Sequence, residues 1–206
     1  MKKSSSSKQW LQRHVNDPYV QRSKREGYRA RSAYKLAEID ARDKLLKPGM
    51  VVVDLGAAPG GWSQVASKKV GAAGKVIAVD LLPMEPITGV TIIQDDFTSR
   101  AGEAAVKEAL GGRKADVVLS DMAPNISGIP TRDQALAFTL AEAARDFALL
   151  HLKPEGVLLV KVLMGAGYDD YLRSLRGTFG KVVVRKPGAS REESVEQYLV
   201  ARGPKP

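Results

Sequence analysis

The most informative stretch of the sequence is a glycine-rich segment that follows an apolar run. Residues 50–55 are apolar apart from Asp54, and residues 54–62 read DLGAAPGGW. Glycines such as Gly60 let the backbone approach a ligand closely, and Trp62 begins a helical pattern whose N-terminus favours polar or anionic groups. Such a loop, placed between a strand and a helix, predicts a binding site for a nucleotide-like cofactor.

Two acidic residues stand where they would complete such a site. Asp80 ends a second apolar segment, twenty residues after Gly60, and Asp96 closely follows a third at 90–94. A carboxylate at Asp80 can accept hydrogen bonds from both hydroxyls of a ribose, and Asp96 can accept one from an adenine amino group. These residue types predict a cofactor that contains adenosine.

S-adenosylmethionine (SAM) and NAD both contain adenosine. A glycine-rich loop with an acid about twenty residues further on is also the dinucleotide fingerprint of dehydrogenases. Here the spacing is G-x-x-x-G-G with Pro59 inside, which departs from G-x-G-x-x-G. The sequence therefore favours SAM over NAD. For each residue taken singly, a plainer explanation stays open: the glycines turn the chain and the acids cap helices.

These residues need a framework of alternating strands and helices to position them. Strands are predicted at residues 50–55, 75–80, 90–94, 115–121, 157–162, 181–186 and 196–201, and helices at about 62–70, 100–110, 133–152 and 168–178. Near-continuous apolar strands separated by helices are typical of a mostly parallel sheet covered on both faces. The predicted fold class is α/β, a doubly wound, mostly parallel seven-stranded sheet.

The N-terminal part of the chain has a different character. Residues 1–8 are rich in Ser and Lys and are predicted to be a disordered basic tail. Residues 9–48 are predicted to form a basic helical extension, with a helical pattern from Trp10 to about Asp43 and a chain break at residues 47–49, KPG. Residues 49–206 are predicted to form the cofactor-binding domain.

After its Ser-rich start, nearly the whole chain resembles the FtsJ/RrmJ-like ribose 2′-O-methyltransferases. The segments that carry the resemblance are VDLGAAPGGW at 53–62, DLLPM at 80–84, SDMAPN at 120–125, VKV at 160–162, RARSAYKL at 29–36 and SVEQY at 194–198. The resemblance implies a Rossmann-like, SAM-dependent methyltransferase fold, and its closeness suggests the bacterial 23S rRNA members. The implied reaction is 2′-O-methylation of a uridine in the A loop of 23S rRNA, within the assembling large ribosomal subunit.

The resemblance also implies a catalytic tetrad of Lys35, Asp121, Lys161 and Glu196. Methyl transfer is an in-line displacement, so the enzyme must hold the ribose oxygen against the methyl carbon and help to remove the hydroxyl proton. Lys161 is unusual inside an apolar strand and is interpreted as a general base or as a group that orients the hydroxyl. Asp121 would orient Lys161 and contact the methionine part of SAM, while Lys35 and Glu196 position ribose and phosphate. Plainer alternatives include a Glu196–Arg191 ion pair.

The cofactor-binding residues expected from these arguments share a place at the ends of strands or in the loops after them. They are Gly60, Trp62, Asp80, Asp96 and Asp121.

Positive charge gathers at the two ends of the chain. The net charge is +9, and residues 1–35 contribute ten Lys or Arg against two acids, whereas residues 36–180 contribute sixteen against eighteen. Cations placed in this way favour RNA as partner, because they neutralise phosphates and release counterions. The candidate phosphate contacts are Arg22, Lys24, Arg25, Arg29, Arg31, Arg185, Lys186 and Arg191. Tyr28 and Tyr34 either stack on bases or belong to the core.

The composition excludes several chemistries. The chain has no Cys, which excludes disulfides, thiolate metal sites and the cysteine nucleophile of pyrimidine C5 methylases. Residues 121–125 read DMAPN, without the aromatic residue that base-amine methylases use for stacking. No apolar run reaches the length of a membrane span, so we expect a cytoplasmic protein. We also expect a monomer without a bound metal ion. Methylation of tRNA and a noncatalytic RNA-binding assembly role remain the alternatives.

Overall fold

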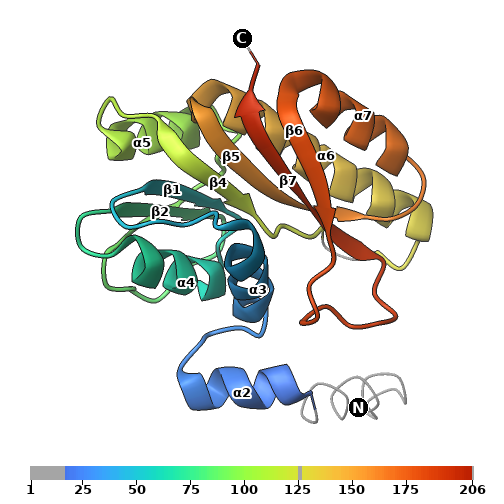
Figure 1. The fold of residues 1–206 in the computed structure, drawn as a ribbon, viewed down its shortest axis with the longest axis horizontal. Helices are drawn as coiled ribbons and strands as arrows, with labels where there is room; N and C mark the ends of the chain where they lie inside the picture. The colour runs from blue at the N-terminus through green and yellow to red at the C-terminus, as the bar shows by residue number, and fades with distance from the viewer. Residues whose placement is uncertain (1–16, 125–126, 206) are drawn as a thin grey trace.

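The computed structural model describes residues 17–124 and 127–205, which form a three-layer α/β fold (Figure 1). Its strands are β1 (Val51–Leu55), β2 (Lys75–Asp80), β3 (Val90–Gln94), β4 (Ala115–Ser120), β5 (Leu152–Leu163), β6 (Phe179–Arg185) and β7 (Glu196–Pro204). They form one sheet in the order β3-β2-β1-β4-β5-β7-β6. The strand pairs are parallel except those of β7 with β5 and β6. The predicted doubly wound, mostly parallel seven-stranded sheet is confirmed.

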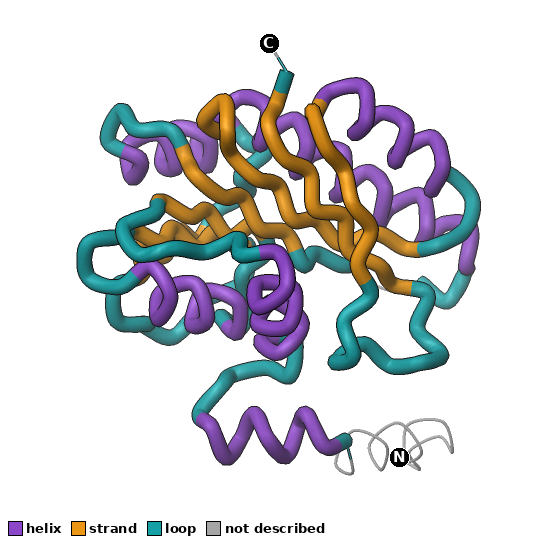
Figure 2. Tube along the Cα trace, viewed as in Figure 1, coloured by secondary structure: helices purple, strands orange, loops and turns teal. Residues whose placement is uncertain are grey.

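Helices cover both faces of this sheet. They are α2 (Pro18–Glu26), α3 (Ala33–Asp43), α4 (Gly61–Val70), α5 (Arg100–Leu110), α6 (Pro130–His151) and α7 (Tyr168–Thr178). Figures 1 and 2 show α3 and α4 on one face, α5, α6 and α7 on the other, and α2 extending beyond α3 at the periphery. Asp121, Lys161 and Glu196 lie at the end of the sheet where the parallel strands finish, and α3 carries Lys35.

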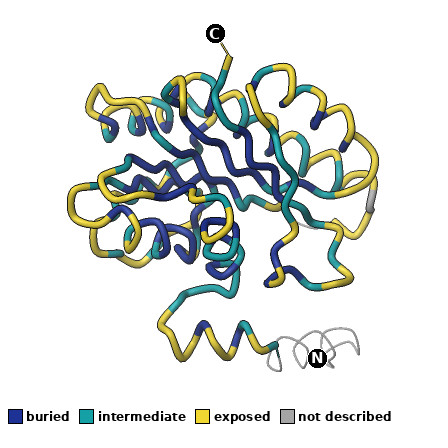
Figure 3. The backbone as a smooth tube through the Cα atoms, in the orientation of Figure 1, coloured by how far each residue is buried: buried dark blue, intermediate teal, exposed yellow. Residues whose placement is uncertain are grey.

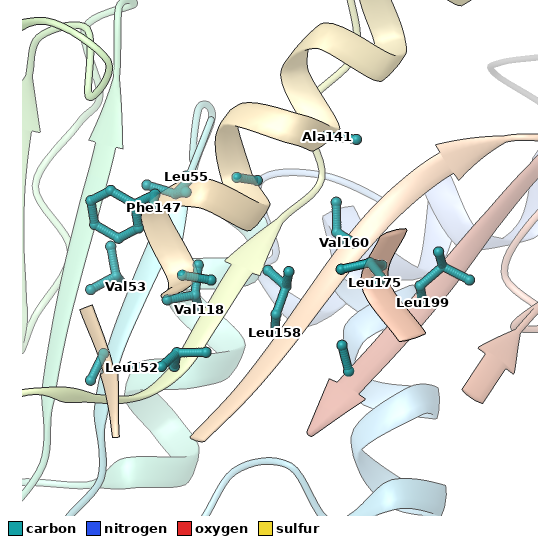
Figure 4. Packing of buried hydrophobic residues seen from close by; sticks show 14 of the residues in the cluster. Val53, Leu55, Val118, Ala141, Phe147, Leu152, Leu158, Val160, Leu175 and Leu199 are labelled. Atoms are coloured by element: carbon teal, nitrogen blue, oxygen red, sulfur yellow. The ribbon is translucent and has the colours of Figure 1, made fainter. Parts of the chain in front are cut away.

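Alternate residues of the strands feed two hydrophobic clusters. Val53 points into the cluster shared with α5, α6 and α7, where it lies among residues such as Leu158 and Phe147 (Figure 4). Its neighbour Val52 points into the cluster shared with α3 and α4. The sheet lies at the centre of the buried region in Figure 3. Each large apolar side chain buried in this way contributes about 1.5–3 kcal/mol, so the two clusters hold the strand ends in fixed positions.

Helix α3, which carries Lys35, is anchored in the second cluster. Leu36 is fully buried and Ile39 is 2% exposed. They pack with Trp62 and Val65 of α4 against the sheet. The helix that presents Lys35 is thus held by the same core that holds the glycine-rich loop.

The structure divides the predicted helical pattern between Trp10 and Asp43. Its first residues lie outside the described part of the chain, and the remainder forms two helices, α2 and α3. Asp17 caps α2, accepting a hydrogen bond from Tyr19 N at 3.0 Å, and Gly27 ends the helix at φ 74°. Only glycine adopts that conformation without strain, so the chain turns there before α3 begins.

Strand β5 begins earlier than expected. The strand was predicted to begin at residue 157, after a helix ending at 152, but residues 152–156 also lie within β5. The pairing with β4 passes from Ala115↔Leu152 to Val117↔Val157, so the extra residues form an irregularity in the ladder. Pro154 is tolerated at such a place because it is not required to donate a ladder hydrogen bond.

Within the described residues, no helix combines the length and the apolar character needed to cross a membrane. The same part of the chain contains no group of three or more His, Cys, Asp or Glu side chains arranged to hold a metal ion.

Candidate active site

The glycine-rich loop joins β1 to α4 and leaves no room for side chains at two positions. A Cβ on Gly56 would lie 2.2 Å from Cγ of Met122, and one on Gly60 would lie 2.7 Å from Cδ1 of Ile87. Both glycines also have positive φ, 69° and 109°. Gly60 precedes the first turn of α4, whose backbone N–H groups have no acceptor within the helix. The loop therefore brings bare backbone and the N–H groups of the first turn of α4 to the carboxyl end of β1.

Trp62 contributes to this loop in a different way from the one expected. Its side chain is 3% exposed, its indole nitrogen donates to the carbonyl oxygen of Ser32 at 2.8 Å, and its ring lies beside Tyr198. The indole is thus part of the core and ties α4 to the start of α3. What Trp62 can offer a ligand is its backbone N–H in the first turn of α4.

Asp80 and Asp96 lie at the ends of neighbouring strands, as predicted. Asp80 accepts hydrogen bonds from Ala58 N and Leu82 N, both at 2.8 Å, and so joins the glycine-rich loop to the end of β2. Asp96 accepts from Thr98 N at 2.8 Å and from its hydroxyl at 2.6 Å. Each oxygen of Asp80 accepts one of these bonds and keeps a further lone pair, whereas both bonds to Asp96 end on Oδ1 and leave Oδ2 to accept others.

Arg29 fastens the loops around this site. Its guanidinium donates to the carbonyl oxygens of Pro59 at 3.2 Å, Glu85 at 2.7 Å and Pro86 at 2.9 Å, and its backbone N–H donates to Gln64 at 2.9 Å. The segment before α3 is therefore linked to the glycine-rich loop and to the loop after β2. This role could not be predicted from the sequence, because backbone carbonyl acceptors carry no residue signature.

Lys161 and Asp121 meet at the ends of β5 and β4. Lys161 Nζ donates to the backbone oxygen of Asp121 at 2.6 Å and lies 3.2 Å from its carboxylate, and both side chains are largely buried. The hydroxyl of Tyr198 donates to the same carboxylate at 2.8 Å. Burial, together with the carboxylates of Asp121 and Glu196, raises the pKa of Tyr198 well above its ordinary value, so this phenol is a permanent donor.

Lys35 and Glu196 form the second pair of the expected tetrad. The Lys35 ammonium is hydrogen-bonded to Glu196 Oε1 and lies 5.8 Å from the centre of the Tyr198 ring. Ser190 donates to the same glutamate oxygen at 2.8 Å. Burial alone would raise the pKa of Glu196, but the Lys35 ammonium, the two hydrogen bonds and the charge of Lys161 hold it below its usual value. The expected Glu196–Arg191 alternative is wrong, since Arg191 instead contacts Asp17 at 3.4 Å.

The four expected residues are therefore brought together. β7 pairs with β5 in a register that places Lys161 opposite Tyr198 and Leu163 opposite Glu196. Because side chains alternate along a strand, Glu196 and Tyr198 lie on the same face of the sheet. Tyr198 thus sits between the two ion pairs.

A buried carboxyl group lies beneath this site. Asp54 is 1% exposed and accepts a hydrogen bond from the Ser63 hydroxyl at 2.6 Å. Burial raises the pKa of Asp54 to about 7; the hydrogen bonds from Ser63 oppose this rise, and the negative charges of Asp121 and Asp80 add to it. Its interruption of the apolar strand 50–55 was the available sequence signal.

Comparison with known proteins shows which family uses this arrangement. The family model for FtsJ-like methyltransferases matches residues 28–204. The chain belongs to the FtsJ-like methyltransferase family. Among the similar curated proteins are those named ribosomal RNA large subunit methyltransferase E from Marinobacter nauticus, 54% identical over 98% of both chains, and from Azoarcus, 55% identical over 97% of this chain and 98% of the relative.

A solved structure shows the same relationship. A crystal structure described as a ribosomal RNA methyltransferase of Plasmodium falciparum aligns with a TM-score of 0.77 and 30% sequence identity, covering 86% of this chain and 98% of its own. The Rossmann-like methyltransferase fold expected from the sequence is thereby confirmed.

The cations predicted to contact phosphate divide into two groups in this methyltransferase. Arg29 binds three carbonyl oxygens, Arg31 is hydrogen-bonded to Asp17 and to the Ala189 carbonyl, and Arg185 forms a bidentate pair with Asp43 at 2.7 Å. These three guanidinium groups are engaged by the protein itself, and their contact with RNA stays a prediction.

Four of the remaining candidates, Arg22, Lys24, Arg25 and Lys186, are exposed. Arg22 is also paired with Glu26 at 2.8 Å, and Lys186 donates to the carbonyl oxygens of Glu192 at 3.2 Å and Ser194 at 3.0 Å. Arg191, which contacts Asp17, is partly buried. Tyr34 is buried and its hydroxyl donates to Glu26 at 2.8 Å, which confirms the interpretation that it belongs to the core.

A cavity of about 300 Å³ lies far from these groups, between the C-terminal ends of α5 and α6. It is lined by residues such as Lys107 and His151, and it lies at the end of the sheet where β4 begins. It is therefore separate from the site at the strand ends.

Proposed function

We propose that this protein transfers a methyl group from SAM to the 2′-hydroxyl of a uridine in 23S rRNA, in the A loop of the large ribosomal subunit. The observation that carries this proposal is the convergence of Lys35, Asp121, Lys161 and Glu196 beside the glycine-rich loop. The two curated relatives, named for methylation of large-subunit rRNA, support the substrate class. The corresponding compartment is the bacterial cytoplasm.

The described residues fit SAM as the methyl donor. The glycine-rich loop offers bare backbone where a Cβ on Gly56 or Gly60 would clash, and α4 offers the N–H groups of its first turn. Asp80 would accept hydrogen bonds from the ribose hydroxyls and Asp96 one from the adenine amino group, and the hydrogen bonds from Ala58 N and Thr98 N hold the two carboxylates in place for this. Bound SAM supplies a methyl group attached to a positively charged sulfur. Asp121, at the end of β4, is the carboxylate that we assign to the methionine end.

In this proposal the tetrad holds and activates the ribose hydroxyl. Lys161 Nζ has two of its three positions occupied by Asp121, which leaves the third for the ribose oxygen. Tyr198 fixes Asp121, so the lysine is held in one orientation. Lys35, paired with Glu196, lies on the other side of the Tyr198 ring and contacts the ribose or the adjoining phosphate. Positioning of this kind accounts for a large part of the rate of a displacement reaction.

The RNA is held in this proposal by exposed cations around the site. Arg22, Lys24 and Arg25 of α2 and Lys186 after β6 are the candidates that the structure leaves exposed. Their contribution is electrostatic, so it depends on salt and not on the base sequence. Specificity then comes from the shape of a large structured RNA.

The decisive experiment is methyl transfer from radiolabelled SAM to large subunits that lack the modification. Label should enter 23S rRNA, and the labelled nucleotide should resist alkaline cleavage, because a methylated 2′-oxygen cannot attack its own phosphate. Mass spectrometry then identifies the nucleotide. The Lys161→Met variant, which keeps a chain of similar length without the amine, should lose transfer and keep SAM binding.

Each alternative outcome has a distinct meaning. Label in an alkali-labile nucleotide would indicate base methylation, and preferential labelling of tRNA would change the substrate. Intact RNA binding without any transfer would support a noncatalytic assembly factor. Tighter binding of NAD than of SAM in calorimetry would contradict the assignment of the cofactor.

A further inference from the structure

The loop between β6 and β7, residues 186–195, packs beside the proposed reaction site. Within it Ser190 is 6% exposed, and its hydroxyl donates to Glu196 Oε1 at 2.8 Å. The same oxygen accepts the hydrogen bond from Lys35. The backbone N–H of Ser190 is fixed by Pro187 O at 2.9 Å. A buried serine therefore shares one carboxylate oxygen with the ammonium of Lys35.

The segment that carries Lys35 also holds the residue preceding Ser190. Ala189 N donates to Glu38 Oε2 at 3.0 Å, and the Ala189 carbonyl accepts from Arg31. Arg31 lies four residues before Lys35 and just ahead of α3, and Glu38 lies three residues after Lys35 within that helix. Both polar groups of Ala189 are thus bound by residues that flank Lys35.

We propose that Ser190 is a positioning residue for methyl transfer, and that Arg31 and Glu38 of the α3 segment hold it in place. The proposal rests on the proposed role of the Lys35–Glu196 pair. A carboxylate oxygen that accepts two hydrogen bonds from fixed donors has a single preferred orientation, and it transmits that orientation to the Lys35 ammonium. Ser190 does not itself contact the substrate; it acts through Glu196.

The effect of the hydroxyl is measurable at Glu196 itself. A donor to the ionised form lowers the pKa of a carboxyl group, so its removal should raise the pKa of Glu196. Carbon-13 NMR titration of the glutamate carboxyl groups, with Glu196→Gln to assign the resonance, reports this value in the intact protein. Ser190→Ala should show the rise, and Ser190→Thr, which keeps the hydroxyl, should not.

The same variants should separate catalysis from binding. We expect Ser190→Ala to lower kcat by about tenfold in methylation of unmodified large subunits, with KM for SAM unchanged. Ser190→Thr should restore most of the rate. Ser174→Ala is the matched control. Ser174 lies on α7, remote from Glu196, and its hydroxyl accepts a hydrogen bond from Arg145 at 2.7 Å. Its kcat should equal that of the wild type.

The proposal is overturned if Ser190→Ala keeps kcat within twofold of the wild type. It is equally overturned if kcat falls but the pKa of Glu196 stays where it was, since the serine would then be merely structural. Glu196→Gln distinguishes this failure from that of the proposed function. Full activity of Glu196→Gln would remove Glu196 from the reaction, whereas an inactive Glu196→Gln with a normal Ser190→Ala would reject Ser190 alone. The double variant should be no slower than Glu196→Gln, because the serine acts through that carboxylate.

Discussion

Replacement of Arg29 by alanine should weaken SAM binding rather than RNA binding. The change removes three hydrogen bonds to the carbonyls of Pro59, Glu85 and Pro86 and leaves the backbone contact with Gln64. These acceptors belong to the two loops that border the proposed cofactor site. In the variant both loops lose a common anchor, so the cofactor must order them when it binds.

The magnitude follows from the three contacts. Hydrogen bonds from a charged donor contribute about 1.5–3 kcal/mol each when buried, but these are partly exposed, so about 0.5–1 kcal/mol each is a suitable estimate. Their sum is roughly 1.5–3 kcal/mol. If about half of that free energy orders the loops for the cofactor, the Kd for SAM rises about three- to tenfold.

Isothermal titration calorimetry with SAM on the wild type, Arg29→Ala and Arg29→Lys tests this reasoning. Lysine keeps the charge but lacks the planar fork, so it should recover only part of the affinity. Arg25→Ala is the matched control, since it removes an exposed cation from the same end of the chain. An unchanged Kd for SAM in Arg29→Ala, together with weaker and less salt-dependent RNA binding, would refute the loop-anchor interpretation and restore the phosphate contact expected from the sequence.

Three further outcomes are expected. Arg25→Ala should lower the slope of log affinity for RNA against log salt concentration by about one. Arg185→Ala should leave that slope unchanged. It should instead lower the free energy of unfolding by about 2 kcal/mol, because the largely buried pair with Asp43 is lost. Because burial raises the pKa of Asp54 to about 7, its stabilising neutral form is lost as pH rises toward and past that value. Asp54→Asn should therefore raise the Tm more at pH 8.5 than at pH 5 in calorimetric scans. Equal effects at the two pH values would contradict this. Tyr198→Phe should lower kcat severalfold without changing RNA affinity, because Asp121 loses a donor at 2.8 Å.

Much of the framework could be predicted from the sequence because its signals are local. The apolar runs of β1, β2 and β3 match the predicted strands to within a residue, and the glycine-rich loop after β1 needs the glycines that the sequence shows. The break between α2 and α3 was missed, although Gly27 was a visible signal for a helix end. A helical pattern of charged and aromatic residues continues across it, and periodicity alone does not mark such a turn.

The tetrad was predicted through resemblance, whereas Gly60, Asp80 and Asp96 were predicted from local pattern. Lys35 and Glu196 are 161 residues apart, and their contact depends on β7 lying antiparallel next to β5. No periodicity within either segment encodes that neighbourhood. Tyr198 was within reach of sequence reasoning, since two-residue alternation places it on the face of Glu196. Ser190 and Arg29 were not, because their partners are a side chain brought close by a loop and three backbone carbonyls.

The N-terminal segment connects the two halves of the site. Arg29 binds the loops next to the proposed cofactor position, while Lys35, six residues later, pairs with Glu196 at the proposed ribose position. Leu36, next to Lys35, is fully buried in the core. Because the core is closely packed, a displacement of one end of the segment is transmitted to the other. We therefore expect two events to be coupled through residues 29–36: the binding of RNA by the protein's cations outside the site, and the binding of SAM inside it. The coupling must be reciprocal: if Arg29→Ala weakens SAM binding by loosening this segment, prior binding of SAM should raise the affinity for RNA in the wild type more than in that variant.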